Sequence, residues 1–380
     1  MVFLISCKSE QKEMDNDVDL PFVLDLNAIS DKIIDLSKLK PGERVLLVMA
    51  PGEFDDIINE LRESIEAKNA AYLGTMSVSD LQPEEWTTTW ISERMNKDDE
   101  RLEALFEDVD LGIMLPGASP IHQPYKVLQS MLEGTSKRTI HFHWAGAYDL
   151  NGNLLNTDDE KSEFYQNVIL NTDYKALSEA QVSFENAMRN EEIRVITEEG
   201  TDISFKIGDR PVTKQDGNAS KSRASEGMNL IDREIEIPSG AIRVAPIEES
   251  VNGIIAFPNA KWDDTDVEDL KVTIESGKIV EIKASKGEEA VRNEMTKAGD
   301  AGRSFREFAL GFNPMMTIQE GNLPWIPYYG YGAGVVRLSL GDNTELGGKV
   351  GGGYVRWNFF PNATVTVGDE IWVKKGKLLR

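Results

Sequence analysis

A strand–helix–strand pattern between residues 43 and 76 constrains the fold more than any other feature of the sequence. Residues 43–50 form a short apolar run that predicts a β-strand, and the Pro51-Gly52 pair after it predicts a turn. Residues 54–68 then repeat apolar side chains at helical spacing, and residues 70–76 form a second apolar run. Two strands that are joined through a helix lie parallel, so we expect an α/β domain with a mostly parallel sheet.

The rest of the N-terminal half fits the same kind of domain. Residues 27–39 carry apolar side chains near helical spacing, and residues 111–115 and 139–144 predict further strands of the sheet. Residues 174–190 predict a helix that leads out of this domain.

The pattern changes after about residue 194. Apolar and polar residues alternate in 195–207 and again within 235–282, which predicts antiparallel strands, and residues 287–299 predict a helix. We therefore expect an N-terminal tether, an α/β domain and an antiparallel-rich α+β domain, at residues 1–19, 20–190 and 191–380.

Composition narrows the function classes. The 380 residues are 40% apolar, enough for two packed domains. The formal charge of −24 opposes nucleic-acid binding, which requires a basic face. The sequence has three histidines, and all of them precede residue 144 (His122, His141 and His143). A site that requires histidine in the C-terminal half is therefore excluded.

The cysteine at position 7 bears on the location of the protein. Leu4-Ile5-Ser6-Cys7 resembles the lipobox of bacterial lipoproteins, in which the cysteine carries the lipid, and the charged stretch 8–17 would then be a tether. Six residues are too few for a signal peptide, so this interpretation places the true start upstream of Met1. It predicts an envelope protein that reaches the membrane only through this lipid. The alternative is a cytoplasmic protein with a frayed terminus.

Standard motifs for nucleotide binding, serine hydrolysis and zinc-dependent hydrolysis are absent from the sequence. His141 and His143 lie two apart on an expected strand and so point to one face, as metal ligands or as polar residues facing a cleft. The acidic run 263–269 lacks the glycine and the terminal glutamate of a calcium-binding loop, so we expect a solvated loop there.

A series of short blocks in the C-terminal half carries a family resemblance. In order along the chain, the blocks are residues 201–205, 237–253, 276–280, 306–314, 337–341, 347–349 and 355–359. Together they resemble the aminopeptidase T family of dinuclear metallopeptidases over about residues 195–360. The resemblance implies a two-domain fold, a homodimer whose sites face an internal cavity, and removal of amino acids from peptide N-termini.

The metal ligands of that family are mostly replaced here. The resemblance implies two metal ions held by two Glu, two His and one Asp, with a Tyr that polarises the reacting carbonyl. The matching ligand positions are Ala241, Glu307, Arg337, Arg356 and Asn358, and the Tyr position falls at about Thr344. Only Glu307 retains the family's ligand. Arginine stays protonated and would repel a divalent cation, so we expect no metal cofactor.

We hypothesise that Arg337 and Arg356 occupy the space of the lost metals and pair with Glu307. The surplus positive charge would hold an anionic small molecule or a peptide C-terminus, and Glu248 and Glu249 would reduce that surplus. A purely structural ion-pair cluster remains the alternative. The aromatic segment 324–331 would then be either a recognition wall or core filling.

The sequence thus predicts an aminopeptidase-T-like protein without peptidase activity and with a repurposed pocket. One alternative is an active aminopeptidase with an all-oxygen metal site, formed by Glu248, Glu249, Glu307 and Asp342. Another is a dioxygenase, since the dihydroxypyridine dioxygenases resemble this family, but their iron-binding histidines are also lost here.

Overall fold

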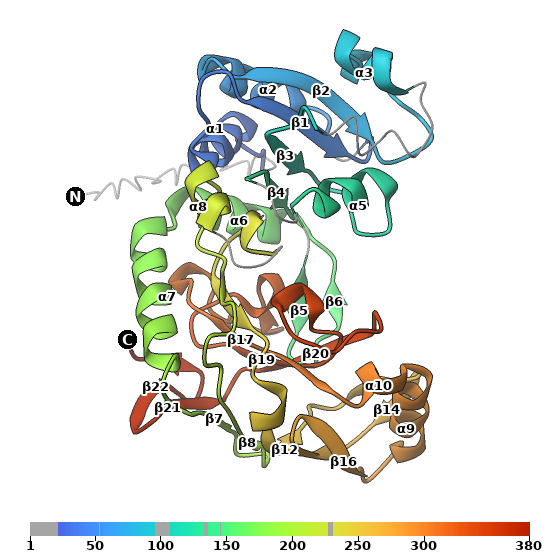
Figure 1. Ribbon diagram of the computed structural model, residues 1–380, viewed down its shortest axis with the longest axis vertical. Helices are drawn as coiled ribbons and strands as arrows, with labels where there is room; N and C mark the ends of the chain where they lie inside the picture. Colours follow the sequence, from blue (N-terminus) through green and yellow to red (C-terminus); the bar gives the residue numbers. More distant parts are fainter. Residues whose placement is uncertain (1–21, 53, 96–106, 133–135, 145, 227–230) are drawn as a thin grey trace, which may run out of the picture.

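The computed structural model describes residues 22–52, 54–95, 107–132, 136–144, 146–226 and 231–380. Cys7 and the predicted tether lie outside these ranges. None of the helices within them is long and apolar enough to cross a membrane. Figure 1 shows an α/β part at the top and an antiparallel part below it.

The α/β part is built on a five-stranded sheet with the order β10-β4-β3-β1-β2. All of its strand pairs are parallel, which confirms the prediction of a mostly parallel sheet. Its elements up to β4 are α1 (Leu26–Ser37), β1 (Arg44–Met49), α2 (Ile57–Ala67), β2 (Ala71–Ser77), α3 (Thr89–Met95), β3 (Leu111–Met114), α5 (Gln123–Ser130) and β4 (Arg138–Phe142).

Helices cover both faces of this sheet. Alternate residues of β1 point to opposite sides: Val45 and Leu47 pack with α1 and α2, whereas Leu46 and Val48 pack with α3 and α5. A strand that is covered on both faces needs apolar residues at nearly every position, which explains its unbroken apolar sequence.

The fifth strand, β10 (Glu234–Ile237), comes from beyond the predicted domain boundary at residue 190. The chain leaves the α/β part through α6 (Asp159–Asn171) and α7 (Tyr174–Met188), passes through the antiparallel part and returns to pair with β4. β10 thus joins the sheet of the α/β part although it follows residue 190 in the sequence. The register places Glu236 beside His141, so the returning strand brings two carboxylates to the histidines of β4.

The antiparallel part contains two sheets that share one hydrophobic core with α7. The first has the order β20-β19-β17-β11-β9, with β9 (Thr213–Lys214), β11 (Ala241–Val244), β17 (Phe305–Gly311), β19 (Val336–Gly341) and β20 (Val355–Phe360). The second has the order β16-β15-β12-β8-β7-β21-β22-β23, with β7 (Ile193–Ile196), β8 (Asp202–Phe205), β12 (Asn252–Ala256), β15 (Lys271–Glu275), β16 (Lys278–Lys283), β21 (Thr364–Val367), β22 (Glu370–Lys374) and β23 (Lys377–Leu378). The predicted antiparallel-rich C-terminal domain is confirmed.

Smaller elements surround these sheets. Two further groups of paired strands are β5 (Ala147–Asp149), β6 (Leu154–Leu155) and β18 (Trp325–Ile326), and the hairpin of β13 (Ala260–Trp262) and β14 (Thr265–Val267). The remaining α-helices are α8 (Lys221–Glu226), α9 (Glu288–Lys297) and α10 (Gly299–Gly302). The acidic run 263–269 starts in the exposed turn of this hairpin at Asp263 and Asp264, but residues 265–267 form β14, so the expected loop is only partly found.

Candidate functional site

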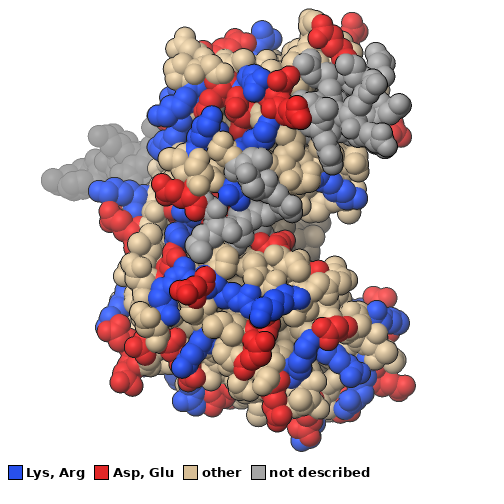
Figure 2. Space-filling view, viewed as in Figure 1, with Lys and Arg blue, Asp and Glu red and all other residues tan. Residues whose placement is uncertain are grey.

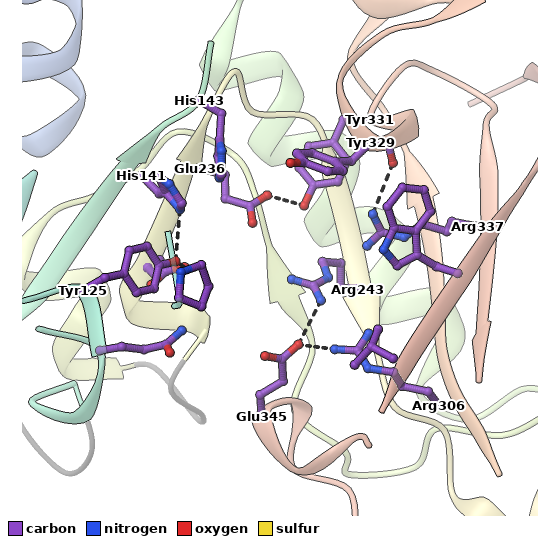
Figure 3. A pocket seen from close by; sticks show the side chains of 15 residues that line it. Tyr125, His141, His143, Glu236, Arg243, Arg306, Tyr329, Tyr331, Arg337 and Glu345 are labelled. Carbon is purple, nitrogen blue, oxygen red and sulfur yellow. Dashed lines mark hydrogen bonds and ion pairs between the residues drawn. The ribbon is translucent and has the colours of Figure 1, made fainter. Parts of the chain in front are cut away.

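A cavity of about 320 Å³ lies between the parallel sheet and the five-stranded antiparallel sheet. One wall carries Tyr125, His141, His143, Glu234 and Glu236. The opposite wall carries Arg243, Arg306, Arg337, Glu345, Tyr331 and Trp357. Figure 3 shows the two walls facing each other, with the guanidinium groups on one side and the histidines on the other. We call them the histidine wall and the arginine wall.

Three arginines surround the buried carboxylate of Glu307 beneath the arginine wall. Arg243 donates from Nε to Oε1 at 2.9 Å and from Nη2 to Oε2 at 3.2 Å. Arg337 donates from Nη2 to Oε1 at 2.8 Å, and Arg306 donates from Nη1 to Oε2. The Glu307 side chain is fully buried, so these contacts replace the water that an exposed carboxylate would bind.

The strand register explains why the arginines converge. Glu307 and Ala309 lie two apart on β17, and Arg243 of β11 and Arg337 of β19 are both paired with Ala309. Paired residues in antiparallel strands share one face, so both guanidiniums extend over the small Ala309 side chain toward Glu307. The ion-pair cluster therefore follows from three adjacent strands.

Glu345 provides a second carboxylate at the rim of this cluster. It lies in the short helix η7 (Thr344–Leu346), and its Oε1 accepts hydrogen bonds from Arg243 at 3.2 Å and from Arg306. The Glu345 side chain is 37% exposed, so water also reaches this carboxylate. Three guanidiniums thus share two carboxylates on the arginine wall.

All of the groups in this cluster that show a pKa shift favour their charged forms. Burial by itself would raise the pKa of Glu307, but Arg243, Arg337 and Arg306 outweigh burial and hold that pKa well below its usual range. Burial likewise opposes the charge on Arg243 and Arg337, and Glu307 outweighs it, so that the pKa of each guanidinium is raised.

Arg337 keeps unused hydrogen-bonding capacity. Besides Glu307 it donates to the backbone oxygen of Tyr329 at 3.2 Å, and its guanidinium carbon lies 5.6 Å from the Trp357 ring centroid and 5.8 Å from that of Tyr331. Its buried Nε has no hydrogen-bond partner. A buried donor without a partner costs free energy, and Nε of Arg356, outside the cavity, is also without a partner.

The histidine wall is held together by its own hydrogen bonds. The Tyr125 hydroxyl lies 3.1 Å from both Nδ1 of His141 and Oε1 of Glu234, and it donates to the latter. The rings of His141 and His143 stack with centroids 3.4 Å apart. Tyr331 of the opposite wall donates its hydroxyl to Oε2 of Glu236, so one side chain bridges the two walls.

Burial sets the protonation of this wall. It lowers the pKa of His143 to about 4, against the opposing effect of Glu236, and it also lowers the pKa of His141, with His143 adding to the shift. Burial and the charge of Glu236 raise the pKa of Glu234 to about 8. At neutral pH the two histidines are therefore uncharged and Glu234 holds a proton.

Arg356 and Asn358 do not join Glu307, so the predicted pairing of Arg356 with Glu307 is wrong. Side chains alternate along β20, and Trp357 is the residue that faces the cavity. Asn358 pairs across the sheet with Leu338 in the core. Arg356 donates to Glu294 at 2.9 Å and stacks on the Trp262 ring, with its guanidinium carbon 3.5 Å from the centroid.

The other predicted acidic residues also lie away from the cavity lining. Glu248 lies apart from the Glu307 cluster. It pairs with Arg210 and accepts the backbone N–H of Lys349 at 2.8 Å. Glu249 is exposed. Asp342 accepts a hydrogen bond from the Thr344 hydroxyl at 2.6 Å, and neither residue lines the cavity.

The donors present do not fit the two metal ions that the family implies. Ala241 is buried with Tyr328, Tyr331 and Met316, and the alanine side chain has no donor atom for a metal ion. Both oxygens of Glu307 already accept guanidinium hydrogen bonds. In the ranges that the structure describes, no group of three or more His, Cys, Asp or Glu residues is arranged to hold a metal ion. Among the described residues, Glu248, Glu249, Glu307 and Asp342 are not brought together as such a group.

Sequence reasoning missed several residues of the site. Arg243 lies two residues after Ala241 on the same strand face, and Arg306 directly precedes Glu307, so a search for cations next to the lost ligands would have found both. Glu345 lies next to none of the lost ligand positions, because it comes from the short helix η7 and not from one of the strands. Glu234 and Glu236 enter the cavity only through the return of β10 to the parallel sheet.

The comparisons with known proteins agree with this architecture. Residues 172–323 match the family model described as thermophilic metalloprotease (M29). The fold is similar to that of wild-type AmpT from Thermus thermophilus, with a TM-score of 0.58, 17% identity, and coverage of 93% of this chain and 99% of that one. It is also similar to 2,5-dihydroxypyridine dioxygenase from Pseudomonas putida KT2440, with a TM-score of 0.59, 16% identity, and coverage of 93% and 96%.

No curated protein sequence matches the chain. The structural similarities, at 16% and 17% identity, establish the fold and no activity. Residues 172–323 of this chain are therefore similar to the thermophilic metalloprotease (M29) family, and the chain as a whole has a fold similar to that of aminopeptidase T.

Proposed function

We propose that this protein is an aminopeptidase-T-like protein that has exchanged the dinuclear metal site for an arginine cluster and has lost peptidase activity. The observation that carries the proposal is the environment of Glu307, the one ligand position that keeps the family's residue. Its carboxylate accepts hydrogen bonds from Arg243, Arg306 and Arg337. Guanidiniums stay protonated at any working pH and repel a divalent cation from this place.

A function as a binding protein for a carboxylate-bearing ligand follows from the same residues. Guanidinium groups bind carboxylates through paired hydrogen bonds, and the partner-free Nε of Arg337 belongs to a side chain that lines the cavity. The cavity volume of about 320 Å³ is at the lower end of the range for small-molecule sites. The proposed ligand is a small carboxylate or the C-terminus of a peptide.

The peptidase part of the proposal is tested with chromogenic aminoacyl substrates in the presence of zinc, cobalt or manganese. We expect no turnover above that of a Glu307→Gln variant. Metal-dependent turnover that this substitution abolishes would restore the alternative, an active aminopeptidase with rearranged ligands.

The binding part is tested by calorimetric titration with N-acetyl-leucine, which carries a carboxylate and no ammonium group. We expect saturable binding to the wild-type protein and loss of at least about tenfold in affinity for Arg337→Gln, since a charge-assisted hydrogen bond contributes about 1.5–3 kcal/mol. Arg356→Gln is the matched control, because Arg356 contacts Glu294 and not the cavity. Binding that both substitutions weaken equally would contradict the proposal.

We also propose that the protein is anchored to the bacterial envelope through a lipid on Cys7 and that it forms a homodimer. The support is the lipobox-like sequence before Cys7 and the dimer that the family resemblance implies. Mass spectrometry of protein isolated from membranes tests the anchor, and an unmodified Cys7 thiol would refute it. Light scattering of the soluble domain tests the dimer.

A further inference from the structure

Two groups on opposite walls of the cavity lack the partners that their chemistry calls for. Among the ion pairs of the described residues, none includes Glu236, which instead accepts a hydrogen bond from Tyr331. On the other wall, the buried Nε of Arg337 has no hydrogen-bond acceptor. One wall therefore offers a carboxylate without a cation, and the other offers the guanidinium group of Arg337, which lines the cavity.

The charges around the cavity are balanced when it is empty. Arg243, Arg306 and Arg337 face the carboxylates of Glu307 and Glu345, and Glu236 supplies a third carboxylate. The fourth carboxyl group at the cavity, that of Glu234, is protonated at neutral pH because its pKa is raised to about 8. A simple anion would make this site net negative, whereas a ligand that carries one charge of each sign would keep the balance.

Tyr331 indicates how far apart the two charged ends of a ligand would be. Its hydroxyl donates to Glu236, and its ring centroid lies 5.8 Å from the guanidinium carbon of Arg337. Since one side chain reaches both groups, they are separated by at most on the order of 10 Å, which one or two extended residues span with a hydrogen bond at each end.

We propose that the cavity binds a zwitterionic amino acid or dipeptide, with its carboxylate at Arg337 and its ammonium group at Glu236. This inference rests on the proposed carboxylate-binding function and adds the class of ligand. Aromatic side chains also line the cavity between and beside the two groups, namely Tyr329, Tyr331 and Trp357. They provide an apolar surface for the ligand's side chain and favourable contact with its ammonium group.

Two matched series of compounds test this assignment in calorimetric titrations of the full chain. The first is L-leucine with N-acetyl-L-leucine and L-leucinamide, and the second is leucyl-leucine with its N-acetylated and its C-amidated forms. We expect the zwitterion of at least one series to bind about tenfold or more tightly than either blocked form, because each blocked form leaves one charged group of the protein unpaired.

The outcomes distinguish this inference from the carboxylate-binding function on which it rests. If the N-acetylated forms bind as tightly as the zwitterions, the ammonium subsite is refuted and the carboxylate-binding function stands. If neither the zwitterions nor the N-acetylated forms bind, both proposals fail. If an amide binds as tightly as its zwitterion, the carboxylate end of the assignment is refuted.

Two substitutions assign the ends of the ligand. Glu236→Gln should abolish the preference for the zwitterion, and the affinity for the N-acetylated form should not fall, because the site loses one negative charge. Arg337→Gln should weaken both forms. The wild-type compound series decides the proposal by itself should either variant fail to fold, and Arg356→Gln serves again as the control. A Glu236→Gln protein that retains the full preference would overturn the assignment.

Discussion

At the scale of single residues, Glu307 matches a metal-ligand position of the similar family and is surrounded by guanidinium groups. A buried carboxylate needs positive partners, and three guanidiniums provide them here. The side chain that the family uses to bind a cation thus retains a cationic environment. Arginine cannot release its charge or activate water, and the proposed loss of peptidase activity rests on this difference from a metal ion.

Removing the charge of Glu307 should destabilise the protein strongly. Glu307→Gln keeps the shape of the side chain but leaves Arg243, Arg306 and Arg337 with Glu345 alone, so we expect a loss of about 3–5 kcal/mol in the free energy of unfolding. Urea denaturation of the wild-type protein and the variant measures this loss.

Glu345→Gln is the matched control for that substitution. Its carboxylate contacts two of the same arginines but is 37% exposed, so water can replace it and the expected loss is about 1 kcal/mol or less. Equal losses for Glu307→Gln and Glu345→Gln would show that Glu307 is not the centre of the cluster.

Glu234 should make stability depend on pH in a defined direction. Its folded-state pKa is about 8, against an ordinary value of 4.5, so between these values the folded protein holds a proton that the unfolded chain has released. Its contribution to stability is fully present below pH 4.5 and declines as the pH rises toward and through 8. A glutamine at position 234 has no proton to lose in this pH range, so Glu234→Gln lacks this contribution.

The measurement is the difference in free energy of unfolding between the wild-type protein and Glu234→Gln at pH 5, 6.5 and 8. We expect the wild-type protein to lose stability relative to the variant across this series, by an amount on the order of a few kcal/mol. The buried histidines have the opposite sign, but they are present in both proteins and cancel in the difference. A constant difference would contradict the raised pKa.

At the scale of secondary-structure elements, the sequence did not predict which face of β20 is turned to the cavity. The family resemblance assigned Arg356 and Asn358 to the ligand positions, but alternation places Trp357 toward the cavity and Arg356 toward Glu294. Sequence matching fixes which strand is involved. It does not fix the face of that strand, which depends on the pairing with β19.

Substitutions at neighbouring positions of β20 should therefore have different effects. Trp357→Ala removes part of the cavity wall and should weaken ligand binding. Arg356→Ala removes a stacking contact with Trp262 and an ion pair with Glu294. It should therefore lower the stability of the protein without changing ligand binding. Calorimetric titration with leucyl-leucine and urea denaturation separate the two effects. A larger loss of binding for Arg356→Ala would contradict the orientation of β20.

At the scale of the whole molecule, local patterns predicted the fold class well. The strand–helix–strand unit gave the parallel sheet, and the alternation after residue 194 gave the antiparallel part. The contact of Arg337 with Glu307 was also predicted. The return of β10 to the parallel sheet was not, because its pairing with β4 joins residues far apart in the sequence. Half of the cavity depends on that return.

The face of the molecule in Figure 2 shows acidic and basic side chains interspersed over both parts. The three arginines that pair with Glu307 are instead buried at the junction of the two parts. The residues on which the proposed loss of metal binding rests are thus internal. They cannot be recognised from net charge.

The metal content of the purified protein tests the central claim most directly. The protein should be prepared without chelators, and its zinc, cobalt, manganese and iron should be measured by mass spectrometry after incubation with each ion and desalting. We predict no stoichiometric metal, because Glu307 is occupied by three guanidiniums and the matching ligand positions lack donors. Two equivalents of a metal ion per chain would contradict the account.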